Sequence, residues 1–300
     1  MSFPEILKNG VRRGVSLKGR TSFRIGGKAE YWYEPEDVPE LSLFLKKLRS
    51  RYPLFVIGAG SNLLVKEGMI RKIFISLRKA DFLNIAEDDG EIRVGAGLRL
   101  NSVVSYLSKK DLGGYEFLAG IPGTVGGALA MNAGARNDYR DHLSGREMKD
   151  IVSYVEVLDK KGDLTRLSKK RIRFFYRDSS LTPYIIVSAG LKFYKAPKSE
   201  VKERIKNNIK ERSRAQDWRY PSTGSFFKNP DYKAAGELID KCGLKGRRVG
   251  GAEVSEKHAN FIINKSGAKS ADVLKLMEII RGRVYNRFKI KLEPEVQIVS

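Results

Sequence analysis

The sequence predicts an α+β fold with two domains, and three observations lead to this class. The chain has 300 residues, enough for two domains that each bury a core. Up to residue 195, short apolar segments with strand-like alternation are separated by glycine-rich turns. Proline and clustered charge interrupt this pattern between Lys195 and Ser199, and longer segments with helical spacing follow. We therefore expect one domain over residues 1–195 and a smaller one over 196–300.

The spacing of apolar residues predicts the order of elements in the first domain. A half-buried strand alternates apolar and polar residues, whereas a helix repeats apolar residues every three to four positions. In chain order we expect a strand, a tight turn and a second apolar segment over 54–65, a half-buried strand over 90–98, a helix over 100–110, a hairpin over 154–168 that turns at 160–163, and a strand over 184–194.

Two helices and a terminal strand are expected in the second domain. The first helix covers residues 195–214, with an apolar residue at every fourth position from Val201 to Ile209 and many basic residues elsewhere. The second helix runs to Phe288 from Ser270, its expected N-cap. Its buried stripe is expected to contain Val273, Leu276, Met277, Ile280 and Val284. The last residues have the alternation of a strand.

The net charge is the unusual feature of the composition. Lys and Arg number 57 and Asp and Glu number 35, which gives a formal net charge of +22. This charge favours anionic partners, such as nucleic acids, membrane surfaces or phosphorylated small molecules. The basic face of the 195–214 helix is interpreted as solvated, and the sequence shows no aromatic–basic motif typical of a nucleic-acid binder.

Three further features indicate a cytoplasmic protein. No run of about 18 apolar residues predicts a membrane span. The N-terminus lacks the apolar core of a secretion signal. The single cysteine, Cys242, cannot form an internal disulfide, and no Cys/His cluster predicts a metal site.

Two glycine-rich segments indicate a site for a diphosphate. They are "IGAGSNLL" at 57–64 and "AGIPGTVGGALAMNAGA" at 119–135. Glycine lets backbone N–H groups approach phosphate oxygens closely and face them together. Neither segment matches the dinucleotide-binding G-x-G-x-x-G pattern or the G-K-[ST] phosphate loop, and one such segment alone would be ordinary turn chemistry. Two in one domain, the second with little charge and with Asn132 inside it, favour a diphosphate cradle.

Residues 224–230, "GSFFKNP", place a serine beside two adjacent rings. Taken alone, Ser225 is typical of a turn residue. A nucleophilic role is disfavoured, because only His142 and His258 could serve as its base. Taken alone, His258 is itself more typical of a structural histidine.

An arginine and two glutamates also allow two interpretations. Arg177, in "FFYRDSS", could pair with Asp178 or lie on the surface. Glu293 and Glu295 alternate on the terminal strand, so they share a face and either one could be solvated.

Seven segments together resemble one known family, the UDP-N-acetylenolpyruvoylglucosamine reductases (MurB), flavoenzymes of bacterial peptidoglycan synthesis. In order they are "TSFRIGGKAEYW" (21–32), "IGAGSNLL" (57–64), "AGIPGTVGGALAMNAGA" (119–135), "YRDSSL" (176–181), "GSFFKNP" (224–230), "AAGELIDKCGLKGRRVGGAEVSEKHANFIIN" (234–264) and "LEPEVQIV" (292–299). Each is weak alone, but seven in this order across nearly the whole chain are specific.

The resemblance implies a fold and a reaction. The fold would be an FAD-binding domain of the vanillyl-alcohol-oxidase (PCMH) type followed by a smaller α+β substrate domain, with the C-terminal strand returning to the FAD domain. The enzyme would use NADPH to reduce noncovalently bound FAD and then convert UDP-N-acetylglucosamine enolpyruvate to UDP-N-acetylmuramate. Its partners would be small molecules, with no specific nucleic acid and no membrane insertion, and it would act as a monomer.

The three catalytic positions of the family fall on Arg177, Ser225 and Glu295. Hydride addition to the enolpyruvyl double bond creates negative charge next to a carboxylate, and an arginine can stabilise this charge. A glutamic acid with a raised pKa can share a proton with the developing enol. A serine hydroxyl held in a dry pocket can protonate the carbanion, and Phe226 and Phe227 are expected to keep the pocket dry.

The remaining site predictions follow the same motifs. The residues predicted to contact FAD are Ile57, Gly58, Ala59, Gly60, Ser61, Asn62, Leu63, Gly120, Pro122, Gly123, Thr124, Gly126, Gly127, Ala128, Asn132, Ala133 and Gly134. The residues predicted to contact the substrate are Lys228, Asn229, Tyr176 and His258, although Lys228 and Asn229 could instead anchor their loop. The segment after "YRDSSL" is short, so the chain resembles the type of family member that lacks a tyrosine loop over the substrate. The candidates for covering it are Tyr139, Tyr176 and Tyr220.

Two other functions remain as alternatives. An FAD oxidase that acts on a sugar or lactone with oxygen would share the glycine segments, but it has no reason to keep Arg177, Ser225 and Glu295 in these contexts. A nucleic-acid-binding protein would use the positive charge, and its binding would fall steeply with salt.

Overall fold

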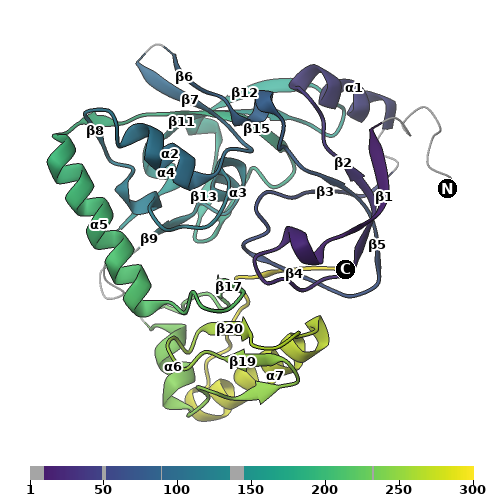
Figure 1. Cartoon of the computed structure of the whole chain (residues 1–300), viewed down its shortest axis with the longest axis vertical. Helices are drawn as coiled ribbons and strands as arrows, with labels where there is room; N and C mark the ends of the chain where they lie inside the picture. The colour runs from purple at the N-terminus through teal and green to yellow at the C-terminus, as the bar shows by residue number, and fades with distance from the viewer. Residues whose placement is uncertain (1–9, 49–51, 89, 136–144, 232) are drawn as a thin grey trace.

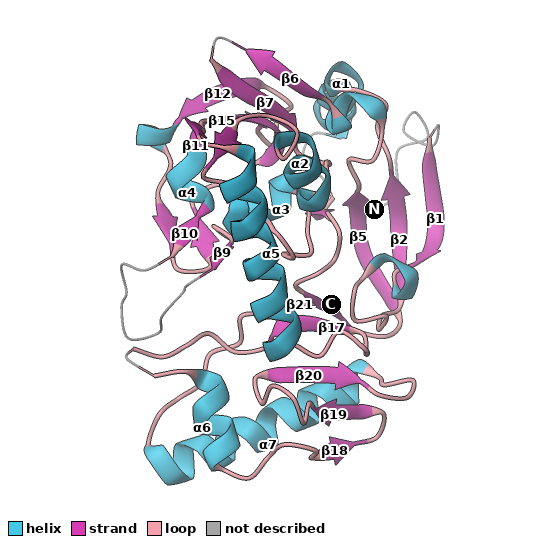
Figure 2. Ribbon diagram, turned by 60° about the vertical axis from the view of Figure 1, so that its left-hand side comes forward, coloured by secondary structure: helices cyan, strands magenta, loops and turns pink. Residues whose placement is uncertain are grey.

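The computed structural model describes residues 10–48, 52–88, 90–135, 145–231 and 233–300 and confirms the α+β class (Figure 1). Two large sheets with their helices form the upper part of the molecule in Figure 1. A third sheet with two helices lies below them, and the chain returns from it to the upper part at its C-terminus (Figures 1 and 2).

The first sheet has the strand order β1-β2-β5-β3. Strand β1 (Val11–Ser16) pairs antiparallel with β2 (Lys28–Tyr33), and β5 (Met69–Ile75) pairs parallel with both β2 and β3 (Leu54–Val56). Helix α1 (Val38–Leu48) connects β2 to β3 and packs its apolar face into the largest core of the molecule. Strands β2 and β3 run in the same direction on either side of β5, so the chain needs a crossover connection between them, which α1 provides.

The second sheet is antiparallel and has the order β12-β11-β15-β7-β6. Its strands are β6 (Ile85–Asp88), β7 (Glu91–Gly95), β11 (Val152–Leu158), β12 (Leu164–Ser168) and β15 (Ile185–Leu191). Every residue of β15, the central strand, is buried, as expected of a strand covered on both faces.

Short helices and strand pairs fill the space around the second sheet. The helices are α2 (Leu100–Leu107), α3 (Val125–Ala130) and α4 (Met148–Ile151). The strand pairs are β8 (Leu112–Gly113) with β16 (Tyr194–Lys195), β9 (Gly134–Ala135) with β10 (Arg146–Glu147), and β13 (Phe174–Phe175) with β14 (Asp178–Ser179). Helix α5 (Lys198–Ala215) then runs along the side of the molecule toward the third sheet (Figure 1).

The third sheet has the order β17-β20-β19-β18 and is antiparallel. Its strands are β17 (Ser222–Ser225), β18 (Arg248–Val249), β19 (Ala252–Val254) and β20 (Phe261–Asn264). Helices α6 (Ala235–Lys241) and α7 (Ser270–Phe288) pack their apolar faces into the core of this sheet.

The C-terminal segment joins the lower sheet to the upper part. Strand β21 (Gln297–Val299) pairs parallel with β4 (Leu63–Val65), which directly follows the first glycine segment. A second link joins the Glu67 carboxylate to Ser270 at the start of α7, through the backbone N–H at 2.6 Å and through the side-chain hydroxyl. These contacts fix the position of the lower sheet relative to the first glycine segment.

The predicted elements agree with the observed ones, with two corrections. The apolar stripe on α7 is buried as expected. The N-cap of α7 is Lys269 and not Ser270, because the Asp272 side chain accepts the Lys269 N–H, whereas the Ser270 hydroxyl donates a hydrogen bond to the Glu67 carboxylate. The stripe on α5 is buried at Val201 and packs against the core at Ile205, but Ile209 is 40% exposed, so the apolar packing of that helix is limited to its first half. No helix in the described part of the chain combines the length and apolar character needed to cross a bilayer.

Candidate active site

Arg177 lies in the two-residue turn of the hairpin β13–β14. Phe175 and Asp178 close this hairpin, and Arg177 has a φ of 58°, in the left-handed region that favours glycine. A residue other than glycine costs roughly 1–2 kcal/mol in this conformation. Such strain is often found at functional sites. The conformation is consistent with a functional role for the Arg177 side chain.

The Arg177 side chain forms an ion pair with Glu295 from the opposite end of the chain. The Nε atom lies 3.1 Å from Glu295 Oε1, and the two side chains are 19% and 16% exposed. Burial raises the pKa of Glu295, and the nearby charges of Arg177 and Lys228 oppose this effect. Because the net shift is upward, this carboxyl group is better able to hold a proton near neutral pH than an exposed glutamate.

Ser225 is brought close to this pair by its own strand. It ends β17, where a register shift accompanies Gly224, whose φ is +79°. The carbonyl of the next residue, Phe226, accepts a hydrogen bond of 2.9 Å from the Glu295 N–H. Phe226 and Phe227 are 0% and 1% exposed, as the dry environment predicted for this segment requires. Two segments about 70 residues apart therefore run side by side here.

The structure distinguishes the two C-terminal glutamates. The backbone carbonyl of Glu293 accepts a hydrogen bond from Lys228 N–H, but its side chain is exposed. The Glu295 side chain points into the ion pair with Arg177 instead. The partner of Arg177 is thus Glu295 and not the adjacent Asp178, whose side chain bonds to the Ser179 N–H.

The two glycine segments contact each other. The Ser61 hydroxyl donates to the Pro122 carbonyl at 2.8 Å. A Cβ atom at Gly58 would lie only 2.4 Å from Thr124 Oγ1, so glycine is required for this close approach. Thr124 itself accepts a hydrogen bond from the Gly127 N–H at the start of α3. The contact gathers backbone groups from both segments in one place, as a diphosphate cradle needs.

Two asparagines of the predicted cofactor set have contacts within the protein. Asn132 is 0% exposed, and its side chain bonds to Glu147, the Phe175 carbonyl and the Lys149 N–H. These bonds use both N–H groups of the side-chain amide, so we expect any contact of Asn132 with FAD to come from its backbone. Asn62 donates through Nδ2 to the Glu295 carbonyl at 3.0 Å, so it links the first glycine segment to the C-terminal segment that carries Glu295.

The predicted substrate contacts differ in their positions. Lys228 lies close enough to Glu295 to affect its pKa. The Tyr176 hydroxyl accepts a 3.5 Å hydrogen bond from the Asn229 N–H, and Arg177 lies over the Tyr176 ring. The Asn229 side chain accepts from the Ala235 N–H at the start of α6, which is the loop-anchoring role left open above.

His258 has a structural contact at its ring. Its Nδ1 accepts the Asn260 N–H at 3.2 Å, and the ring packs against Phe261. Among the candidates for covering the substrate, Tyr220 lies beside the amine of Lys265, whereas Tyr176 lies next to Arg177. Tyr139 and His142 are outside the residues that the structure describes.

Comparison with known proteins agrees with this arrangement. The model of an FAD binding domain matches residues 29–168, and the model of the UDP-N-acetylenolpyruvoylglucosamine reductase C-terminal domain matches residues 216–299. These matches define a flavoprotein with an FAD-binding domain and a smaller C-terminal domain. Arg177 lies between the two matched ranges.

Relatives match over nearly the whole chain. The UDP-N-acetylenolpyruvoylglucosamine reductase 2 of Symbiobacterium thermophilum is 40% identical over 96% of this chain and 92% of its own length, and the reductase of Clostridium tetani is 38% identical over 97% and 92%. The crystal structure of the Thermus caldophilus reductase (MurB) superposes with a TM-score of 0.82 at 36% identity, covering 97% of this chain and 99% of that one. The chain belongs to the UDP-N-acetylenolpyruvoylglucosamine reductase family of oxidoreductases, as the seven motifs indicate.

The residues present fit FAD. The backbone of both glycine segments converges, and Gly123 and Gly127 in the second segment are not buried. Gly60 has a φ of +65°, and a Cβ atom at this position would lie 2.3 Å from the Arg20 carbonyl oxygen, so the backbone here requires glycine. Residues 57–63 and 120–127 would hold the diphosphate through backbone N–H groups.

We expect Gly60→Ala to lower the FAD content of the purified protein. The added Cβ would push Arg20 away and open the cradle. Gly14→Ala is a matched control, since Gly14 has the same φ of +65° with nothing within 4 Å of the added Cβ. Both variants carry the left-handed strain of about 1 kcal/mol. The ratio of flavin to protein absorbance measures the effect, and equal ratios in the two variants would contradict the assignment.

We expect Arg177→Met to raise the pKa of Glu295 further. The guanidinium favours the charged carboxylate, so its removal favours the protonated form. The protonated-carboxyl stretch in the infrared spectrum, identified by its loss in Glu295→Gln, should then persist to higher pH. Arg177→Lys keeps the charge and should stay close to the parent midpoint. An unchanged or lower midpoint in Arg177→Met would show that the ion pair does not control this carboxyl.

Proposed function

We propose that the chain reduces UDP-N-acetylglucosamine enolpyruvate to UDP-N-acetylmuramate with NADPH, through noncovalently bound FAD, in the synthesis of peptidoglycan precursors. It would act as a monomer in the cytoplasm. The observation that carries this proposal is the convergence of Arg177, Glu295 and the Ser225 segment beside the loops that fit FAD. Membership of the reductase family supports the same substrate.

Each side chain has a separate task in the reduction. FAD, when bound and reduced by NADPH, would supply the hydride for the enolpyruvyl double bond. The Arg177 guanidinium stabilises the negative charge that develops beside the substrate carboxylate, because it stays protonated and donates several N–H bonds. Glu295, with its raised pKa, holds a proton near the developing enol oxygen.

The Ser225 hydroxyl donates the proton that completes the reduction. A serine is a weak acid in water, but a carbanion is a strong base, and transfer is efficient when the hydroxyl is fixed close to the carbon. The buried rings of Phe226 and Phe227 would exclude water from the side of Ser225 on which they pack. Lys228 adds positive charge for an anionic part of the substrate, which fits a protein whose substrate, cofactor and hydride donor are all polyanions.

We expect Ser225→Ala to separate the two half-reactions. NADPH should still bleach the flavin at the parent rate, because that step needs no proton from Ser225. Reoxidation of the reduced flavin by the enolpyruvyl substrate should slow by roughly 10²–10⁴-fold, the usual contribution of a general acid. Anaerobic stopped-flow absorbance resolves the two steps. Reoxidation of Ser225→Ala at the parent rate would remove Ser225 from the mechanism.

The overall reaction is tested directly by product analysis. The purified chain would be incubated with NADPH and UDP-N-acetylglucosamine enolpyruvate without oxygen, and the products analysed by mass spectrometry. The proposal predicts a UDP-sugar heavier than the substrate by two hydrogen atoms. Unchanged substrate, together with oxygen consumption when simple sugars are supplied, would instead favour the oxidase alternative.

A further inference from the structure

The segment that carries Ser225 is held by an unusual set of contacts beyond the end of its strand. Regular pairing between β17 and β20 stops at Ser225 and Phe261. The next two residues, Phe226 and Phe227, are buried, so their backbone N–H and C=O groups need partners. On one side the Glu295 N–H bonds to the Phe226 carbonyl, as described above.

A single residue, Asn260, supplies the partners on the other side. Its backbone carbonyl accepts the Phe226 N–H at 2.7 Å. Its side-chain Oδ1 accepts the Phe227 N–H at 3.0 Å, and its Nδ2 donates to the Phe227 carbonyl at 2.8 Å. The carboxamide thus bonds both backbone groups of one residue, as a neighbouring strand would. Asn260 is 3% exposed, so the contacts are shielded from water.

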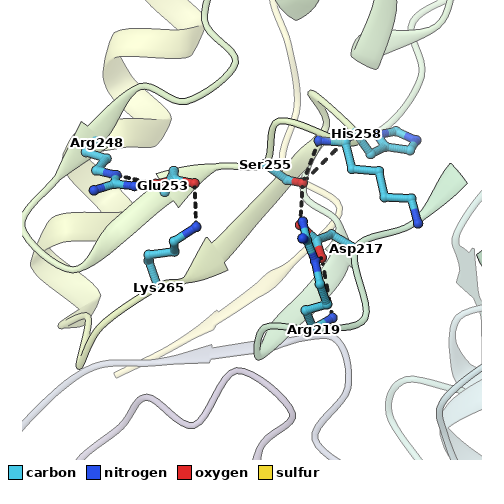
Figure 3. A network of polar contacts seen from close by, with 8 residues as sticks. Asp217, Arg219, Arg248, Glu253, Ser255, His258 and Lys265 are labelled. Carbon is cyan, nitrogen blue, oxygen red and sulfur yellow. Dashed lines mark hydrogen bonds and ion pairs between the residues drawn. The ribbon is translucent and has the colours of Figure 1, made fainter.

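Asn260 is itself held in a braced turn between β19 and β20. Its N–H donates to His258 Nδ1, and burial lowers the pKa of His258, which keeps the ring neutral and this nitrogen able to accept. The backbone N–H of His258 donates to the Ser255 hydroxyl at 3.4 Å, and that hydroxyl donates to the Asp217 carboxylate at 3.2 Å (Figure 3). The Asp217 carboxylate is 2% exposed and also accepts from Arg219.

We infer that Asn260 is a positioning residue for proton transfer, which fixes the backbone after Ser225 so that the hydroxyl stays in register with Glu295. This role rests on the proposed function. Loss of the carboxamide would remove both bonds to the Phe227 backbone, whereas the Phe226 N–H would keep the Asn260 carbonyl and the Phe226 carbonyl would keep the Glu295 N–H. The segment would therefore be loosened at Phe227 without being released. Because proton transfer depends steeply on distance, a small displacement would slow this step without removing any group that binds substrate.

The chain offers a matched control at Asn264, the last residue of β20. Asn264 is also a buried amide, and its side chain bonds two backbone groups, those of Phe23 and Ala268, and neither Phe226 nor Phe227. We would compare Asn260→Leu and Asn264→Leu, which each remove a carboxamide at similar volume. Asn260→Asp adds an isosteric variant that keeps an acceptor for the Phe227 N–H and loses the donor to its carbonyl.

The test follows reoxidation of NADPH-reduced enzyme by UDP-N-acetylglucosamine enolpyruvate at several substrate concentrations. We expect the limiting rate to fall about 10–100-fold in both Asn260 variants, as for a displacement near 1 Å, with a larger solvent deuterium isotope effect. The substrate concentration at half-saturation and the rate of flavin bleaching by NADPH should stay at the parent values. Asn264→Leu should reoxidise at the parent rate, whatever its thermal midpoint.

Four results would overturn the inference. Parent-like limiting rates in the Asn260 variants would show that the clamp is not needed. An equal loss of limiting rate in Asn264→Leu would indicate general destabilisation. A change only in the substrate concentration at half-saturation would indicate a role in substrate binding. If the parent enzyme itself is not reoxidised by the substrate, the proposed function is wrong and the positioning role fails with it. If Asn260→Leu does not retain flavin, the limiting rate of reoxidation is measured on the isosteric Asn260→Asp alone: a fall supports the inference, and a parent-like rate overturns it.

Discussion

The ion pair between Arg177 and Glu295 is the contact on which the site depends. A buried carboxylate is costly unless it is paired or protonated, and Glu295 has both a cationic partner and a raised pKa. Arg177 comes from a hairpin of the upper part and Glu295 from the last segment of the chain. The pair therefore exists only when the C-terminal segment is docked, and docking places the Ser225 strand against the same segment.

The return of the chain also links the Glu295 segment to the glycine segment that fits FAD. Strand β21 lies beside β4, and Asn62 in the loop before β4 donates to the Glu295 carbonyl. The loop proposed to hold the diphosphate and the segment that carries Glu295 are thus parts of one hydrogen-bonded unit. Under the proposed function, this unit would keep the cofactor and the Glu295 carboxyl in a fixed relation.

Sequence reasoning predicted the elements well, and the family resemblance named Arg177 and Glu295, which the structure brings into contact. Apolar spacing located α7 and the 154–168 hairpin because these depend on local periodicity. It could not choose between Glu293 and Glu295, since alternation places both on one face and only the distant Arg177 distinguishes them. The bonds that hold the Asn132 side chain could not be predicted from the sequence, because Glu147 and Phe175 are distant in the chain and leave no local pattern. Asn260 was missed for the same reason, although a lone amide before the apolar "FII" was a signal.

The most direct test of the account is the visible spectrum of the purified protein without oxygen, recorded as NADPH and then UDP-N-acetylglucosamine enolpyruvate are added. The account predicts a yellow protein that NADPH bleaches and that regains its colour when the enolpyruvyl substrate is added, because the site delivers hydride and proton in turn. A bleached protein that regains colour only when oxygen is admitted would contradict it. A protein that cannot be loaded with FAD would contradict the cradle as well.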